Sequence, residues 1–369
     1  MRLARVGPIV KQKGFVAWGA KVFLQKACFR MEDRYSRQIL FAEIGERGQQ
    51  RLRQSRALIV GCGALGSLQA EMLARAGIGG LLIADRDFVE FSNLHRQMLF
   101  TEQDARERTP KAVACAAHLG AINSEVEVQS RIVDVNASNI EELLFDCDLV
   151  LDGTDNFSTR YVINDACVKR GVPWIYGAAV GAYGLTMTVL PRETPCLRCL
   201  FPDVPQAGSG ATCDTAGVIM PIIATVVAVQ VAEALKILTG RHQALHRSLM
   251  QFDLWRNEWR RVPLGTPDEG CPVCRGTSYP ALEAEAVDQI VVLCGRDAVQ
   301  ITPLNRGRLN LAEIFERFRA VGEAQANPYL VRVRLGDYEL TVFEDGRAIV
   351  RGTEDAARAR ALYARYVGA

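Results

Sequence analysis

The sequence has little histidine, no internal repeat and no low-complexity tract. Only four histidines occur in 369 residues, and none is spaced like a pair of metal ligands, so a histidine metal site is not indicated. The lack of repeats excludes a solenoid. Acidic residues are missing from residues 1–30, which hold seven Lys or Arg. Because the overall formal charge is +2, the remainder is net −5, and a mildly acidic body suggests no nucleic-acid partner.

The basic segment 1–30 also lacks a convincing cleavage signature. An acid-free, amphipathic-looking stretch is a possible targeting sequence. We instead expect a mobile extension, or translation from an upstream start codon, because Met31-Glu32-Asp33 lies directly before the motif Arg34 to Gln38.

No charged residue occurs from Thr215 to Ala232, a length close to that of a membrane span. Pro221 and Gln230 interrupt this stretch, and Glu233 follows it at once. We therefore predict a buried helix and no membrane partner.

Alternating strand and helix patterns predict an α/β fold, with a Rossmann-like, doubly wound and mostly parallel sheet. The strand-like runs are Leu58 to Val60, Leu81 to Ala84, Val126 to Arg131, Leu149 to Leu151 and Pro173 to Tyr176. A crossover segment rich in Gly, Pro and Ser follows at Pro202 to Ala216, and a boundary falls near Ser278 to Ala286. We expect a nucleotide-binding domain over residues 31–280 and a small C-terminal α+β domain over residues 285–369.

A glycine loop, Gly61-Cys62-Gly63-Ala64-Leu65-Gly66, lies between the first predicted strand and a helix predicted from Ser67 to Ala76. In this arrangement backbone N–H groups and a helix N-terminus face a bound phosphate. Asp85 ends the second strand, 24 residues after Gly61, where an acidic side chain binds the hydroxyls of a ribose. Alone, this pattern favours a nicotinamide-dependent oxidoreductase.

The residues after Asp85 change that interpretation. Asn93, Arg96, Gln97 and Lys111 lie within the next 26 positions, and such donors neutralise a triphosphate of roughly four negative charges. A dinucleotide needs far less positive charge, so ATP becomes the expected ligand.

Five motifs occur in a fixed order: Arg34 to Gln38, the glycine loop, Asn93 to Gln97, Pro110-Lys111, and Asp152 to Asn156. In this the chain resembles the bacterial E1-like adenylyltransferases, the family of ThiF and MoeB, from about Asp33 to Cys274. The segment from Cys294 to Asp297 and the residues after it resemble the C-terminal part of ThiF proteins from Gram-positive bacteria.

The resemblance implies ATP-dependent adenylylation of the terminal glycine carboxylate of a ubiquitin-like sulfur carrier protein of the ThiS type. Lys111 and Arg96 would contact the triphosphate, Asn93 would orient it and Asp155 would hold Mg²⁺. The nucleotide-binding residues are then Gly61, Gly63, Ala64, Gly66, Asp85, Asp87, Asn93, Arg96, Gln97, Lys111 and Asp155.

The chain has eleven cysteines, of which four form two Cys-x-x-Cys pairs: Cys196 with Cys199, and Cys271 with Cys274. The others are scattered through apolar segments, which fits a reducing cytoplasm better than a disulfide-bonded secreted chain. Four thiolates make a closed tetrahedral site, so we predict structural Zn²⁺. Buried thiols or a redox pair are the alternatives.

Two further assignments come from the resemblance. Arg37 would act as an arginine finger in the site of a neighbouring subunit, which implies a homodimer; a structural ion pair is the alternative. Cys213 would form a covalent link with the carrier during sulfur transfer, with a donor such as a cysteine desulfurase, unless it is a spare loop thiol.

The carrier's identity stays open between the thiazole pathway of thiamine biosynthesis and molybdopterin synthase, because motif spacing does not encode a protein-binding surface. A non-catalytic carrier-binding module would need a degraded nucleotide site, and none of the expected residues is missing.

Overall fold

The computed structural model describes residues 34–203, 216–283, 289–293, 297–303 and 308–368. The basic segment 1–30 and Cys213 lie outside these ranges, as do Cys294 to Arg296.

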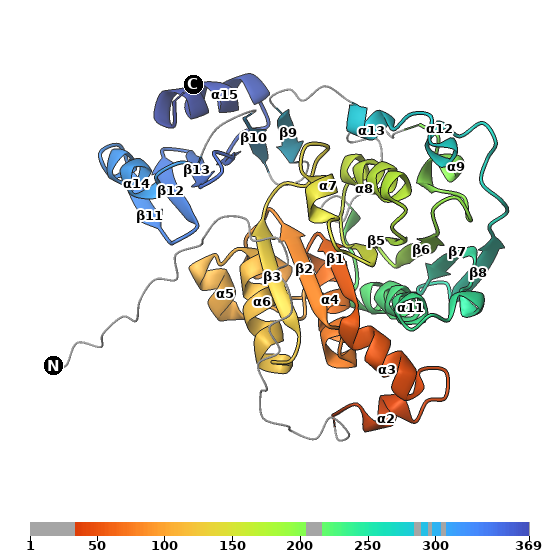
Figure 1. The fold of residues 1–369 in the computed structure, drawn as a ribbon. Coiled ribbons are helices and arrows are strands. Elements are labelled where there is room, and N and C mark those ends of the chain that lie inside the picture. Colours follow the sequence, from red (N-terminus) through yellow and green to blue (C-terminus); the bar gives the residue numbers. More distant parts are fainter. Residues whose placement is uncertain (1–33, 204–215, 284–288, 294–296, 304–307, 369) are drawn as a thin grey trace.

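An eight-stranded sheet forms the centre of the larger part of the chain, in the order β3-β2-β1-β4-β5-β6-β7-β8 (Figure 1). The first five are parallel and the last three pair antiparallel. This confirms the predicted doubly wound, mostly parallel sheet, whose switch point lies between β1 and β4. The strands are β1 (Arg56–Val60), β2 (Gly80–Asp85), β3 (Glu127–Ile132), β4 (Leu149–Asp152), β5 (Trp174–Val180), β6 (Tyr183–Val189), β7 (Ser248–Asp253) and β8 (Glu258–Pro263).

Helices cover both faces of this sheet, so its central strands are apolar on each side. Ala57 and Ile59 of β1 lie in one buried cluster, with residues of α3, α4, α6 and α11. Leu58 and Val60 lie in the other, with residues of α7 and α8. The bounds are α2 (Ser36–Ile39), α3 (Gly45–Gln54), α4 (Ala64–Ala76), η1 (Phe91–Asn93), α5 (Glu102–Glu107), α6 (Lys111–Ile122), α7 (Ile140–Leu143), α8 (Phe157–Arg170), α9 (Leu197–Leu200), α11 (Met220–Leu238), η2 (His242–Ala244), α12 (Pro272–Arg275) and α13 (Pro280–Glu283).

Helix α11 is long and apolar enough to cross a membrane by length and composition alone. It packs against α4, β5 and β6, and it buries Gln230 and Glu233. The charge-free stretch therefore includes a helix that covers one face of the sheet, as predicted.

The C-terminal residues form a second, six-stranded antiparallel sheet in the order β11-β12-β13-β14-β10-β9. Helices α14 and α15 pack on one face of it, over a core that includes Val333, Phe318 and Tyr363. The elements are β9 (Gln289–Leu293), β10 (Ala298–Thr302), α14 (Leu311–Arg319), β11 (Glu323–Ala326), β12 (Leu330–Leu335), β13 (Tyr338–Phe343), β14 (Ala348–Arg351) and α15 (Ala356–Tyr366). We call this unit the C-terminal module.

Candidate nucleotide site and cysteine cluster

The glycine loop connects β1 to α4 and lies against the loop after β4. Gly61 has φ +84°, and a Cβ there would lie 2.7 Å from the carbonyl oxygen of Gly153. A Cβ on Gly66 would lie 1.8 Å from the oxygen of Gly61. Glycine is therefore required at both positions, because the loop backbone packs directly against itself and against the segment after β4.

Helix α4 begins at Ala64, three residues earlier than the predicted Ser67. Ala64 and Leu65 are strong helix formers, so the helix extends into the glycine loop. This places the N-terminus of α4, the positive end of its dipole, inside the glycine loop.

Asp85 fastens the glycine loop to the end of β2. Its Oδ2 accepts a hydrogen bond from the N–H of Cys62 at 2.5 Å, and its Oδ1 accepts one from the N–H of Asp87 at 2.6 Å. Burial raises the pKa of Asp85, while nearby Lys111 opposes the shift. A carboxylate has about four acceptor positions, so Asp85 retains capacity to accept from ribose hydroxyls.

Lys111 is the first residue of α6 and is only 5% exposed. Its backbone N–H donates to the carbonyl of Asp87 at 2.8 Å, and its Nζ lies 3.3 Å from Asp87 Oδ2. Asp87 thus fixes the lysine at both ends.

The segment around η1 carries the other predicted donors. Asn93 is buried, and its Oδ1 accepts from the N–H of Glu90 at 3.1 Å. Arg96 donates to the carbonyl of Ser92 at 2.9 Å. Gln97 is 3% exposed and lies beside Gly63; its Oε1 has no hydrogen-bond partner among the described residues. A buried amide without a partner at the glycine loop suits a site that is completed by a polar ligand.

The two aspartates after β4 have different environments. Asp152 is fully buried, its Oδ2 lies 3.1 Å from Arg160 Nε, and its Oδ1 accepts from Thr154. Asp155 is exposed. Burial alone would lower the pKa of Arg86, but the nearby carboxylates of Asp134, Asp87 and Asp155 outweigh this effect and raise it. Asp152 is therefore structural, whereas Asp155 offers a carboxylate to a cation such as Mg²⁺.

Arg37 lies on α2, at the other end of the fold from the glycine loop (Figure 1). The next residue, Gln38, donates to the carbonyl of Ala76 at 2.8 Å, at the C-terminal end of α4. Helix α4 has 13 residues and is therefore about 20 Å long. Since the glycine loop lies at its N-terminal end, Arg37 is well separated from the nucleotide site of its own chain.

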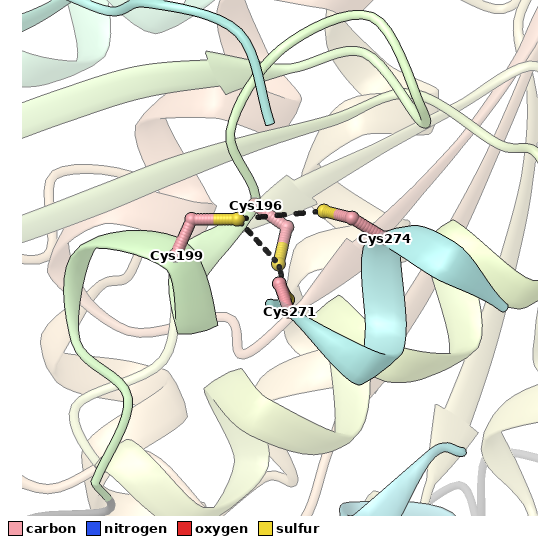
Figure 2. A group of neighbouring side chains, drawn as sticks. All are labelled: Cys196, Cys199, Cys271 and Cys274. Carbon is pink, nitrogen blue, oxygen red and sulfur yellow. Dashed lines mark hydrogen bonds between the residues drawn. The ribbon is translucent and has the colours of Figure 1, made fainter. Parts of the chain in front are cut away.

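The four predicted cysteine ligands come together (Figure 2). All four Sγ atoms lie within 4.8 Å of one another. Three separations are 3.8 Å for Cys196–Cys199, 3.7 Å for Cys196–Cys271 and 3.5 Å for Cys199–Cys274. Metal–sulfur bonds of about 2.3 Å in a tetrahedron give edges of about 3.8 Å, so the cluster fits a tetrahedral metal site.

Buried polar groups hold this cluster against α8. Asn164 accepts from the N–H of Leu197 at 2.8 Å, and Arg198 lies 2.9 Å from Asp165. These contacts orient the first Cys-x-x-Cys turn beside α8 and so support the geometry of the cluster.

Residues of the C-terminal module also reach the nucleotide site, which the sequence did not indicate. A small pocket is lined on one side by Asp87, Phe88, Glu90, Asn93 and Lys111, and on the other by Ala298, Ile349 and Arg351. Arg351 and Glu90 are 261 residues apart, and no local motif marks their contact.

Comparison with known proteins agrees with this geometry. The ThiF family matches residues 35–273. The chain is 47% identical over 340 residues to the sulfur carrier protein ThiS adenylyltransferase of Bacillus subtilis, covering 92% of this chain and all of that protein. It is 39% identical to the Escherichia coli protein of the same description, covering 66% of this chain and 96% of that protein.

Among solved structures, E. coli MccB with ATP shares 22% identity at a TM-score of 0.57, covering 66% of this chain and 74% of that one. That likeness concerns the fold alone. The motifs that follow the carboxyl ends of β1, β2 and β4 lie on one rim of the sheet. With the match over residues 35–273, they lead to one conclusion: the chain belongs to the ThiF family.

Proposed function

We propose that this chain uses ATP to adenylylate the C-terminal glycine carboxylate of a ThiS-type sulfur carrier protein, with release of pyrophosphate. The observation that carries the proposal is the 47% identity to the B. subtilis ThiS adenylyltransferase along that protein's whole length, C-terminal module included. The charged groups around the glycine loop supply the chemistry that such a reaction needs.

The reaction needs positioning and charge stabilisation more than proton transfer. A terminal carboxylate is ionised at neutral pH, so it attacks the α-phosphorus of ATP without a general base. A bond forms between the carboxylate oxygen and the α-phosphorus, the bond from that phosphorus to the bridging oxygen breaks, and pyrophosphate leaves with the electron pair. Preorganised cations stabilise the charge that develops.

Each part of the nucleotide site has its own role in binding ATP. Backbone groups of the glycine loop and the start of α4 face the phosphates, and Asp85 accepts from the ribose. Lys111 and Arg96 neutralise the triphosphate, and Asn93 orients it. Asp155 would hold Mg²⁺, which supplies further charge neutralisation at the phosphate oxygens.

The cysteine cluster holds Zn²⁺ in this proposal. Four thiolates at tetrahedral separations suit that ion, and a full ligand set leaves no open position for water. The metal therefore stabilises the packing of α9 and α12 on α8 and takes no part in adenylylation.

A homodimer with two composite sites explains the position of Arg37. Because this exposed arginine is remote from its own glycine loop, it is suited to complete the site of a second subunit as an arginine finger. Sulfur transfer to the adenylated carrier would come next, with Cys213 forming the covalent link and a cysteine desulfurase as donor, to give a thiocarboxylate for thiazole formation in the cytoplasm.

ATP–pyrophosphate exchange tests the proposal, with a purified ThiS-type carrier and a molybdopterin-synthase carrier assayed side by side. We expect carrier-dependent exchange that is faster with the ThiS type. Faster exchange with the other carrier would move the chain to the MoeB-like reaction. No exchange with either carrier would refute adenylylation of sulfur carriers.

A further inference from the structure

The loop after β2, residues 86–90, packs against the C-terminal module. The contact is on the face of the module's sheet that α14 and α15 do not cover. Phe88 packs in a buried apolar cluster with residues from β10, β12, β13 and β14, namely Ala298, Leu330, Phe343 and Ile349. The loop therefore has an apolar anchor in a different sheet from the one it leaves.

Two polar contacts fix the start of the same loop. Arg347 is 2% exposed, and its Nη1 donates to the carbonyl of Arg86 at 3.1 Å. Gln300 of β10 donates to Asp134 at 2.9 Å, and Asp134 in turn lies 3.0 Å from Arg86 Nη1. Arg86 stands between the two predicted nucleotide-site aspartates, Asp85 and Asp87.

A third contact reaches the end of the loop. Arg351, at the end of β14, forms an ion pair with Glu90. The backbone N–H of Glu90 donates to Asn93 Oδ1, so the chain of contacts runs from the module to the amide that is expected to orient ATP. Arg351 also lines the small pocket together with Asn93 and Lys111.

We propose that Arg351 is a positioning residue for ATP, acting through Glu90 on Asn93, and that the C-terminal module thereby belongs to the nucleotide site. The inference rests on the proposed function for its substrate. The loop between β2 and η1 is irregular over residues 86–90, so contacts with other elements must hold it in one geometry. Without the Arg351 ion pair, Glu90 and Asn93 lose one of their fixed supports, and ATP must order them on binding.

A purely structural role predicts a different pattern of effects. The Arg351 and Glu90 side chains are 32% and 22% exposed, so solvent screens their ion pair in part and its contribution to overall stability is modest. In contrast, small misplacements of a positioned group reduce rates by up to about a hundredfold. Loss of Arg351 should therefore weaken ATP use far more than it lowers the melting temperature.

The test compares Arg351→Ala with Arg319→Ala in the full-length protein. Arg319 lies on α14 of the same module, paired with Glu316 and 60% exposed, so it is a matched surface arginine outside the contact. We expect Arg351→Ala to raise the KM for ATP about tenfold and to reduce the ATP-induced rise in melting temperature. Arg319→Ala should change neither, and Arg351→Lys should recover part of the loss.

Exchanging the charges of Arg351 and Glu90 distinguishes an effect on the position of Asn93 from an effect on folding. The double variant Arg351→Glu with Glu90→Arg restores the pair in reverse, and it should bring back at least part of the ATP-induced stabilisation that each single change removes. Unchanged ATP stabilisation in Arg351→Ala would overturn the proposal, as would a fall in melting temperature without ATP that accounts for the whole loss. Because ATP stabilisation is measured without a carrier, it tests Arg351 even if exchange with sulfur carriers fails.

Discussion

Replacement of Lys111 by methionine should abolish most adenylylation while leaving the fold intact. The lysine is 5% exposed at the start of α6, and methionine retains a flexible apolar stem that fills the same space. What disappears is one preorganised cation at the triphosphate, which costs about 3 kcal/mol, or roughly a hundredfold in rate.

The structure predicts a further loss, because Asp87 Oδ2 lies 3.3 Å from the lysine Nζ. Without its partner, the Asp87 carboxylate faces the incoming phosphates as a like charge. At an effective dielectric constant of about 20, two unit charges roughly 4 Å apart interact by about 4 kcal/mol. Adding Asp87→Asn to Lys111→Met should therefore recover part of the activity, although Asp87→Asn alone removes a support of the lysine.

Carrier-dependent ATP–pyrophosphate exchange measures both effects as kcat/KM ratios. Lys169→Met is the matched control, since its Nζ pairs with Glu141 at 3.2 Å on an exposed surface. Near-parental exchange in Lys111→Met, with an unchanged melting curve, would refute the charge-stabilisation argument. No recovery on adding Asp87→Asn would refute the account of Asp87 as the source of the additional loss.

Three other predictions concern the composite site, the metal and the crossover thiol. Mixing inactive Arg37→Ala with inactive Asp155→Ala should restore up to about one intact site in each mixed dimer, whereas mixed dimers that stay inactive would exclude action in trans. Cys271→Ser should lower zinc content and melting temperature together, because metal binding is coupled to folding; elemental analysis that finds no zinc in the fresh parent protein would contradict this. Cys213→Ala should keep pyrophosphate exchange but fail to make thiocarboxylate, and thiocarboxylate at the parental rate would make it a spare thiol.

The sequence predicts the nucleotide-binding half of the fold well, for a physical reason. The five predicted runs correspond to β1 through β5. Continuous apolar runs mark β1, β2 and β4, which are largely buried, whereas β3 at the edge of the sheet is mostly polar and partly exposed. In the C-terminal module, strand patterns at Ile290 to Leu293, Tyr329 to Leu335 and Glu339 to Phe343 predict β9, β12 and β13, but the sequence does not predict β10, β11, β14 or α14. β10 pairs with β14, about 50 residues further along the chain, so no local pattern marks that pairing.

In the candidate site, too, features set by neighbouring residues were predictable, whereas contacts between residues far apart in the sequence were not. The two Cys-x-x-Cys turns are local patterns, and their convergence within 4.8 Å was predictable from ligand chemistry. The hydrogen bonds that Asp85 accepts from the N–H groups of Cys62 and Asp87 could not be predicted, because a sequence does not show which backbone donors lie near a carboxylate. The Arg351–Glu90 pair is beyond any local pattern, since 261 residues separate its members.

The distance along α4 between Arg37 and the glycine loop determines whether one chain can bring both into the same site. Asp85, Asp155 and the glycine loop lie at or after the carboxyl ends of parallel strands, so a single sheet brings them together. Arg37 precedes the first strand, and its neighbour Gln38 contacts the C-terminal end of α4, about 20 Å along that helix from the glycine loop. An extended arginine side chain spans far less than this distance. If Arg37 takes part in the reaction, it must therefore do so in a second subunit, and a monomeric form of the enzyme should retain ATP binding while losing most of its rate of adenylylation.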